Sequence, residues 1–113
     1  MPKKYKKAVT SAVTVIKKQI DQNPGNGLKT ASLAVKMGIS RNVLQEVFKA
    51  QYGTSIGEYK LQLRMRQAKQ HLKNGKSIKE VSIILRYSSP SSFSNAFRSF
   101  FDASPTEWLQ DRR

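Results

Sequence analysis

The chain has 113 residues, enough for one small domain or two very small subdomains but not for an enclosed catalytic chamber. It contains no cysteine, so disulfide bonds, thiolate metal sites and cysteine nucleophiles are excluded. Lysine and arginine number 21 against 7 acidic residues, and the net charge of +14 indicates a polyanionic partner, most often nucleic acid.

The basic beginning of the chain is not typical of a signal peptide. MPKKYKKA is followed by VTSAVTVIKKQI, where polar residues interrupt the apolar ones and no cleavage site follows. No apolar run approaches the length of a membrane-spanning helix. The lysines Lys3, Lys4, Lys6 and Lys7 form either a solvated helix start or a basic arm.

The first third of the chain predicts two helices. Residues 4–22 form an amphipathic helix that ends at the NPG of 23–25. A short helix over 30–37 ends at Gly38, because glycine adopts the left-handed C-cap conformation at least cost. The apolar face of the first helix comprises Ala8, Ala12, Val15, Ile16 and Ile20.

Two longer helices follow. Ser40 caps a helix over 41–52, and the longest helix, over 56–73, is opened by Thr54 or Ser55. Apolar residues recur in both at spacings of three and four. The buried faces comprise Val43, Leu44, Val47 and Phe48 in the first of these helices and Leu61, Met65, Ala68 and Leu72 in the second.

The C-terminal part predicts three further helices. Ser77 opens a short one, with Glu80 completing a capping box. The serine-rich stretch YSSPSSFSNAF at 87–97 is a helix start rather than a linker, since Ser88 or Ser89 caps and proline suits the first helical position. Ser104 and Pro105 begin the last helix, which carries Trp108 and Leu109. The predicted buried residues are Ile78, Val81, Ile84 and Leu85, followed by Phe93, Phe97, Phe100 and Phe101.

A short helix, a tight turn and a longer serine-capped helix thus occur twice, at 30–51 and at 77–100, which is typical of two helix-turn-helix units. The predicted fold is all-α, with about seven helices in two homeodomain-like subdomains, 1–53 and 76–113, joined by a linker helix at 54–75. Eighteen helical residues span about 27 Å at ~1.5 Å per residue. Successive major grooves on one face of DNA lie ~34 Å apart, so with the width of the flanking units added to the helix, one monomer can fill two adjacent grooves.

In each unit the two helices must pack closely, which requires a small residue four positions before the turn. Ala34 and Gly38 meet this requirement in the first unit, and Ser82 and Arg86 take the same positions in the second. Serine is acceptable at its position, but arginine is not an obvious turn residue, and a left-handed conformation there would cost it about 1 kcal/mol because its Cβ crowds the backbone.

From about residue 10 to residue 110 the sequence resembles the DNA-binding domain of AraC/XylS-type bacterial transcription regulators. The segments that carry the resemblance are SLAVKMGISRNVLQEVFKAQYGTSIGEY, LRMRQAKQHL and SIKEVSIILRYSSPSSFSNAFRSFFDASPTEW. The last is similar to the family pattern I-x-x-[VI]-A, G-[FY]-x-S-x-S-x-F-x-R-x-F and G-x-S-P. The departures are Glu46 and Asn95, each at a usual arginine, Ser82 at a usual alanine, and Arg86 and Asp102, each at a usual glycine.

The resemblance implies that the second helix of the first unit faces DNA bases with Arg41, Asn42, Gln45 and Glu46. Arginine pairs with guanine, and asparagine or glutamine with adenine, each pair giving roughly 1–3 kcal/mol of discrimination. Glu46 either accepts a hydrogen bond from a cytosine amine or pairs with the lysine three residues later. The expected phosphate contacts are Ser40 and Lys49. The alternative is that these residues only form the solvated face of the helix.

In the second unit, Ser91, Ser92 and Asn95 are expected to face the bases. Small hydroxyl groups at a helix start let it approach DNA closely, so this helix contributes more to positioning than to specificity. The expected phosphate contacts are Ser89, Ser94 and Arg98. The alternative, plain helix capping, holds for at least one of the serines.

An enzyme is not expected, because one histidine, no cysteine and seven scattered carboxylates provide no triad, metal spacing or phosphate-binding loop. We therefore predict no catalytic residue, metal or cofactor. The aromatic residues are expected in the core, and His71 has no expected role. The alternatives are a sequence-tolerant architectural DNA- or RNA-binding protein and, with less support, a membrane-surface helix at 4–22.

The expected partner is double-stranded promoter or operator DNA in the bacterial cytoplasm, at the nucleoid, with RNA polymerase as a further candidate and no membrane. Family members commonly carry a separate sensing or dimerisation domain. The chain is therefore either a one-domain regulator or a fragment of a longer one. We expect a monomer, with any dimer formed through such a further domain.

Overall fold

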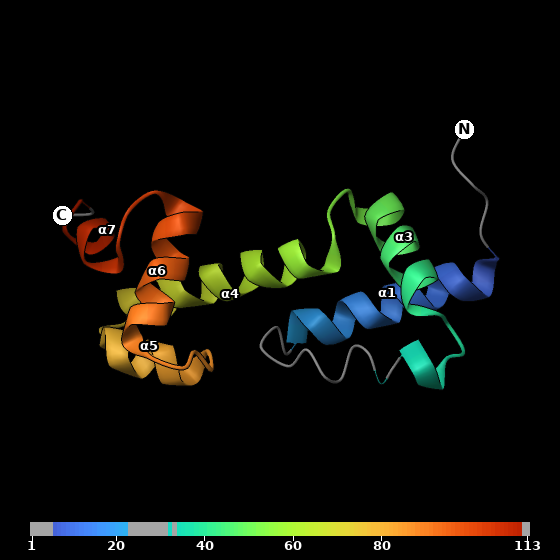
Figure 1. Ribbon diagram of the computed structural model, residues 1–113, viewed down its shortest axis with the longest axis horizontal. Helices are drawn as coiled ribbons and strands as arrows, with labels where there is room; N and C mark the ends of the chain where they lie inside the picture. Colours follow the sequence, from blue (N-terminus) through green and yellow to red (C-terminus); the bar gives the residue numbers. More distant parts are fainter. Residues whose placement is uncertain (1–5, 23–31, 33, 112–113) are drawn as a thin grey trace. The chain divides into compact units, whose positions relative to one another are not determined.

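The computed structural model describes residues 6–22, 32 and 34–111, and these residues form helices and no strand (Figure 1). The helices are α1 (Lys7–Gln22), α3 (Arg41–Tyr52), α4 (Ile56–Lys73), α5 (Ile78–Ile84), α6 (Pro90–Phe101) and α7 (Pro105–Asp111). Residues 32 and 34–36, between α1 and α3, are also helical. The all-helical prediction is confirmed. Lys3, Lys4, the NPG at 23–25 and the start of the helix predicted at 30–37 lie outside the described residues.

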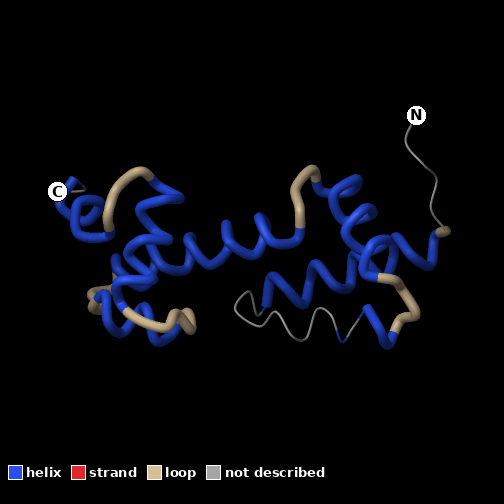
Figure 2. The backbone as a smooth tube through the Cα atoms, viewed as in Figure 1, coloured by secondary structure: helices blue, strands red, loops and turns tan. Residues whose placement is uncertain are grey.

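The chain divides into two compact units within α4, one ending at Leu63 and the other beginning at Arg64. Helix α4 has the bounds that the sequence predicts, 56–73, and is continuous (Figure 2). Its first turns belong to the first unit and the rest to the second.

The core of the first unit is formed where α1 packs against α3. Its fully buried side chains are Val13, Ile16, Ile20, Val47 and Phe48. Two predictions for α1 are wrong, because Val15 is 42% exposed and Ala8 is exposed as well. The buried residues at 13, 16 and 20 follow spacings of three and four, whereas Val15 lies about 100° around the helix from Ile16 and so faces away from α3.

A polar cluster ties the end of α1 to the start of α4 in the same unit. The Lys17 Nζ donates a hydrogen bond to Asp21 at 3.1 Å, and the hydroxyl of Tyr59 donates another to the same carboxylate. Lys17 also lies 5.4 Å from the ring centre of Tyr52 and 5.3 Å from that of Tyr59. The hydrogen bonds of the Tyr59 hydroxyl and of Asp21 raise the pKa of Lys17. This cluster fixes the position of α4 within the first unit.

The second unit packs α5 and α6 together with the second half of α4 and with α7. Its buried apolar residues are Met65, Ala68, Leu72, Val81, Leu85, Phe93 and Phe97, to which Pro105 adds its ring. Ile84 and Phe100 were expected inside, but they are 44% and 38% exposed. Both lie in the last turn of their helices, α5 and α6. The predicted stripes are therefore right in direction and one residue too wide.

Phe97 is the centre of the aromatic packing in the second unit. Its ring centre lies 5.9 Å from that of Phe93, 4.6 Å from Phe101 and 6.0 Å from Trp108. The Nζ of Lys69, on α4, lies 3.7 Å from the ring centre of Phe101, a cation–π contact. These contacts hold α6 by its buried face and leave its opposite face exposed.

Candidate nucleic-acid interface

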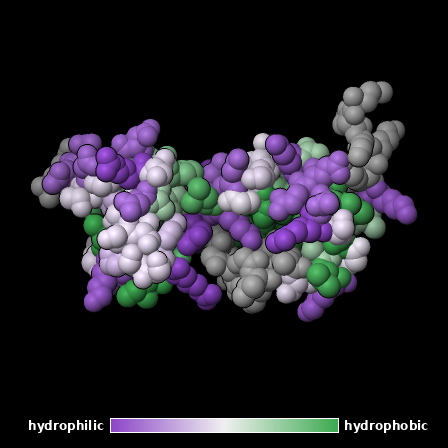
Figure 3. Space-filling model, in the orientation of Figure 1, coloured by the Kyte–Doolittle hydropathy of each residue, from purple (hydrophilic) through white to green (hydrophobic). Residues whose placement is uncertain are grey.

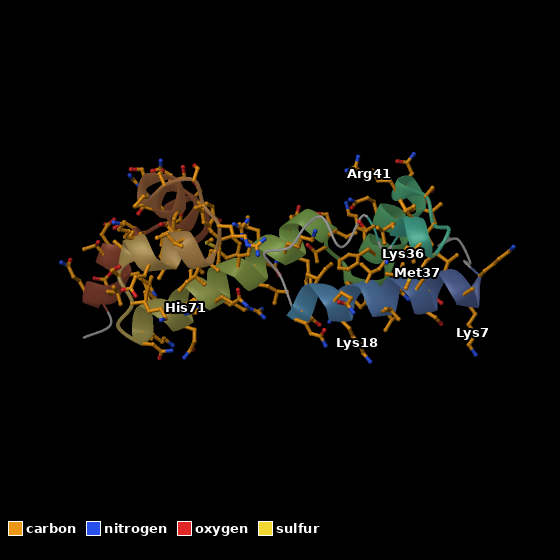
Figure 4. All side chains as sticks on the ribbon, turned by 90° about the horizontal axis from the view of Figure 1, so that it is seen from below. Lys7, Lys18, Lys36, Met37, Arg41 and His71 are labelled. Carbon is orange, nitrogen blue, oxygen red and sulfur yellow. The ribbon has the colours of Figure 1, made fainter. Side chains whose placement is uncertain are left out.

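Helix α3 presents the first set of predicted site residues. Ser40 is its N-cap, and the Ser40 hydroxyl accepts a hydrogen bond from the Val43 backbone N–H at 3.2 Å. The helix ends at Gly53, which is left-handed with φ 73°. The predicted base- and phosphate-facing residues are all exposed, and they are Arg41, Asn42, Gln45, Glu46 and Lys49. Figure 4 shows Arg41 at the beginning of the helix with its side chain directed into solvent.

The five predicted site residues of α3 share one face, opposite its buried one. Leu44, Val47 and Phe48 are turned toward α1, with 4%, 0% and 0% of their surface exposed. The structure therefore brings the five polar side chains together on a single surface, which we call the α3 face. A helix with one face buried and the other rich in Arg, Asn and Gln has the chemistry for reading base edges in a major groove.

Helix α6 presents the second set. Ser89, rather than Ser88, is its N-cap, and Pro90 occupies the first turn, as the sequence predicts. Ser91, Asn95 and Arg98 are exposed, whereas Ser89, Ser92 and Ser94 are half-buried. Phe93 and Phe97 are fully buried on the other side of the helix. We call the exposed surface formed by residues 91, 95 and 98 the α6 face.

Three serine hydroxyls at the start of α6 bind one another. Ser89 Oγ accepts from the Ser92 N–H at 3.0 Å and donates to Ser92 Oγ at 3.0 Å, and Ser88 Oγ lies 3.0 Å from the same atom. The Ser92 hydroxyl is thus already used within the protein. For the expected base contact, Ser92 can offer only the hydrogen bonds that its hydroxyl does not already make with Ser88 and Ser89. Ser91 and Asn95 have exposed side chains.

Each of these helices follows a turn with the same hydrogen bonds. In the first turn the Gly38 N–H donates to the Val35 carbonyl at 3.0 Å and the Ile39 N–H to the Ala34 carbonyl at 2.9 Å. In the second, the Arg86 N–H donates to Ile83 at 3.1 Å and the Tyr87 N–H to Ser82 at 2.8 Å. This pair of bonds is the Schellman motif, which ends a helix through one left-handed residue.

The left-handed residues of the two turns are Gly38, with φ 69°, and Arg86, with φ 62°. The predicted equivalence of the two turns is therefore confirmed, and Arg86 adopts the left-handed conformation although arginine is not an obvious turn residue. Ala34 and Ser82, the small residues four positions earlier, are 4% and 2% exposed and let the helices of each pair approach closely.

Most of the acidic residues have roles in the local structure. Glu80 and Glu107 complete capping boxes with Ser77 and Ser104, and the backbone N–H of each serine lowers the pKa of its partner carboxyl. Glu58 accepts a hydrogen bond from the Thr54 hydroxyl. Of the seven acidic residues of the chain, Glu46 is the one on the α3 face, and the α6 face has none. Both faces therefore keep a positive or neutral character, which suits a polyanion.

The visible surface of each unit is largely hydrophilic (Figure 3). Within the described ranges, no three His, Cys, Asp or Glu side chains are grouped closely enough to hold a metal ion. Over the same residues, no helix has the length and apolar character needed to cross a membrane. His71 is half-buried near the end of α4.

One residue important to the second unit was missed by sequence reasoning. Arg64, on α4, donates a hydrogen bond from its Nη2 to the carbonyl of Leu85 at 2.6 Å, and its guanidinium lies 4.4 Å from the ring centre of Tyr87. Arg64 thus contacts both Leu85 and Tyr87, the residues on either side of the left-handed Arg86. In the sequence LRMR at 63–66, Arg64 and Arg66 look alike. In the fold, Arg64 is half-buried and makes these contacts, whereas Arg66 is exposed.

A family model described as "Helix-turn-helix domain" matches residues 33–111. The Msm operon regulatory protein of Streptococcus mutans is 35% identical over 100 residues, which are 88% of this chain and 36% of that protein. The chain thus spans about a third of that relative's length.

Solved structures agree. A transcriptional regulator described by its AraC-type DNA-binding domain, from Chromobacterium violaceum, is 31% identical with a TM-score of 0.75, covering 90% of this chain and 92% of that one. The DNA-binding domain of AdpA, solved with a target DNA, has a TM-score of 0.77 over 90% of this chain and 93% of its own, at 19% identity. The second likeness bears on the fold alone.

Proposed function

The chain belongs to the AraC-type family of helix-turn-helix DNA-binding domains, and from this premise we propose that it binds specific sequences of double-stranded DNA as part of a transcription regulator. The observation that carries the proposal is the pair of capped helices, α3 and α6. Each has one face buried in aromatic and aliphatic side chains and one polar face exposed, and each follows a Schellman turn.

The α3 face supplies the base readout. Arg41, Asn42 and Gln45 are exposed on it, and these three residue types make bidentate hydrogen bonds with guanine or adenine in the major groove. Glu46 contributes through a cytosine amine or through Lys49, and Lys49 and Ser40 contact the flanking phosphates. Because α3 is fixed against α1 by Val47 and Phe48, its exposed side chains enter the groove in one register.

The α6 face mainly positions the protein. Ser91 and Asn95 meet base edges, Ser92 does so through the capacity its hydroxyl retains, and Arg98 contacts phosphate one turn later. Ser89 and Ser94 are half-buried beside this face and add contacts to the phosphate backbone. Serine hydroxyls are too short to discriminate well between bases, so this helix gives less specificity than α3.

The two helices bind successive major grooves of one duplex, from subdomains at 1–53 and 76–113 joined by the helix within 54–75. The chain acts without catalysis, as a monomer in the bacterial cytoplasm. RNA polymerase is a partner of the bound regulator, and any dimer forms through a further domain. Family membership and the length of α4, eighteen residues, support this arrangement.

Selection of bound duplexes from a random pool tests the proposal. We expect two short preferred blocks about one helical turn apart, ~34 Å. Gln45→Ala is expected to lose discrimination at one or two base pairs and to keep its nonspecific affinity. Arg98→Ala, the matched phosphate variant, is expected to weaken all sequences alike and to flatten the dependence of log K on log salt by about one unit.

The net charge of +14 also fits a sequence-tolerant architectural protein, and the same experiment separates the two functions. A specific site is bound about 10³ to 10⁷ times more tightly than random DNA at matched salt. A ratio far below this range, with identical behaviour of the Gln45 and Arg98 variants, would replace the proposed function with the architectural one.

A further inference from the structure

The turns before α3 and α6 differ at their left-handed residue, and only the turn before α6 carries backbone strain there. A residue without a Cβ adopts φ near +60° freely, whereas any other L-residue is strained there. Gly38 meets this requirement in the first turn, with φ 69°. The second turn makes the same two hydrogen bonds around Arg86, with φ 62°, and so holds a strained residue where glycine would be relaxed.

The packing of the protein does not explain the choice of arginine. The side chain of Arg86 is exposed, and no described residue accepts a hydrogen bond or forms an ion pair with its guanidinium. In the first turn a Cβ added at Gly38 would meet no atom within 4 Å, so lack of space does not decide between the two residues there either. The strain at Arg86 is therefore not offset by a contact inside the described part of the chain.

The backbone on both sides of Arg86 is firmly held. The carbonyl of Leu85 accepts the 2.6 Å hydrogen bond from Arg64, and the ring of Tyr87 stacks on the guanidinium of the same residue. The ring of Tyr87 also packs on Phe93, with 5.7 Å between ring centres. Arg86 therefore projects its cation from a rigid turn rather than from a mobile loop. Strained residues that the surrounding structure fixes in this way concentrate at functional sites.

We propose that Arg86 is a further DNA contact, in which its guanidinium binds the phosphate backbone beside the groove that α6 enters. The inference rests on the proposed function. The planar guanidinium donates two parallel hydrogen bonds to a phosphate, and its charge is retained at every physiological pH. The residue stands three positions before Ser89, the N-cap of α6, so it reaches the strand that flanks this helix. The contact involves no base and is the same for every sequence.

Arg86→Gly tests the proposal because it moves stability and affinity in opposite directions. Relief of the left-handed strain, less the greater flexibility of glycine in the unfolded chain, raises the folding equilibrium constant about two- to fivefold. Loss of one phosphate contact flattens the salt slope by about 0.9. That slope corresponds to about eightfold weaker binding at 0.1 M salt and about fourfold at 0.2 M, for specific and random duplexes alike.

Asp102→Gly is the matched control, since Asp102 is the other non-glycine residue of positive φ among those described and lies in the same unit. It also relieves left-handed strain, although less of it because aspartate tolerates this conformation better than arginine, and it removes an acidic side chain, so its affinity stays equal or rises. Arg86→Lys keeps the charge and is expected to keep the salt slope of the original protein.

Each result of the comparison has a clear reading. Arg86→Gly with unchanged affinity and slope overturns the contact, and so does a loss confined to particular base pairs, which would make Arg86 a base reader. A loss shared by Asp102→Gly also overturns it, because relief of strain would then be the cause. If the original protein shows no sequence preference, the proposed function fails, whereas the Arg86 contact is still judged by the salt slope on random duplexes.

Discussion

The substitution Arg64→Met tests whether the side chain of Arg64, on α4, stabilises the turn that precedes α6. The substitution keeps most of the side-chain volume but removes the hydrogen bond to the Leu85 carbonyl and the stacking on Tyr87. The hydrogen bond, with a charged donor, contributes about 1.5–3 kcal/mol, and the cation–π contact adds about 0.5–1 kcal/mol. The two contacts act on one short turn, so their loss is felt locally.

One term acts in the opposite direction. The Nε of Arg64 is buried and has no hydrogen-bond partner among the described residues. A buried donor without an acceptor costs about 1–2 kcal/mol, which methionine does not incur. The net expected destabilisation of the second unit is therefore about 1.5 kcal/mol.

Urea unfolding of the whole chain measures this change. Trp108 is the only tryptophan, and it lies in the second unit against Phe97, so its fluorescence follows that unit. With a slope of about 1–3 kcal/mol per molar urea, the midpoint is expected to fall by about 0.5–1.5 M. Arg66→Met, on the exposed side of the same helix, is the control. If the two variants unfold at the same midpoint, the assigned role of Arg64 is wrong.

Two further predictions concern helix caps. Ser89→Ala removes the hydroxyl that accepts from the Ser92 N–H, so the second unit is expected to lose about 1 kcal/mol and the Ser92 amide to exchange faster; unchanged exchange would contradict the cap. The pKa of Glu107 in the folded protein lies below its ordinary value of 4.5, because the Ser104 N–H donates a hydrogen bond to its carboxylate. This interaction therefore stabilises the fold fully above pH 4.5, and its contribution is lost as the pH falls through the folded pKa. Glu107→Gln is expected to lower the difference in urea midpoint between neutral pH and pH below 4.5, and an unaltered difference would refute the assignment.

The helix bounds were predictable because their signals are local. Ser40, Ser77 and Ser89 each accept a hydrogen bond from a backbone N–H three residues later, and each cap is readable without knowledge of the rest of the chain. The equivalence of Arg86 and Gly38 was predictable for another reason, the repetition of a short helix, a turn and a capped helix, whereas the left-handed conformation of Arg86 is a finding of the structure. The polar faces of α3 and α6 followed from the same periodicity.

Other features depend on which helix covers which, and periodicity leaves that open. Val15, Ile84 and Phe100 belong to apolar stripes, yet each is more than a third exposed in the folded protein. The hydroxyl of Ser92 was counted as free for DNA, and the structure shows it bound to two other serines. Neither result is encoded in spacing alone.

By itself, the sequence determined the positively charged, all-helical character, the caps and turns, and which surfaces of α3 and α6 are polar, because charge, capping and periodicity act over a few residues. Only the tertiary structure decided that Arg64 binds the carbonyl of Leu85, 21 residues later in the chain, in the turn around Arg86. The same holds for Lys69, which lies over the ring of Phe101. Such contacts join side chains from different helices, and a long basic side chain in a sequence looks the same whether it extends into solvent or lies against an aromatic ring.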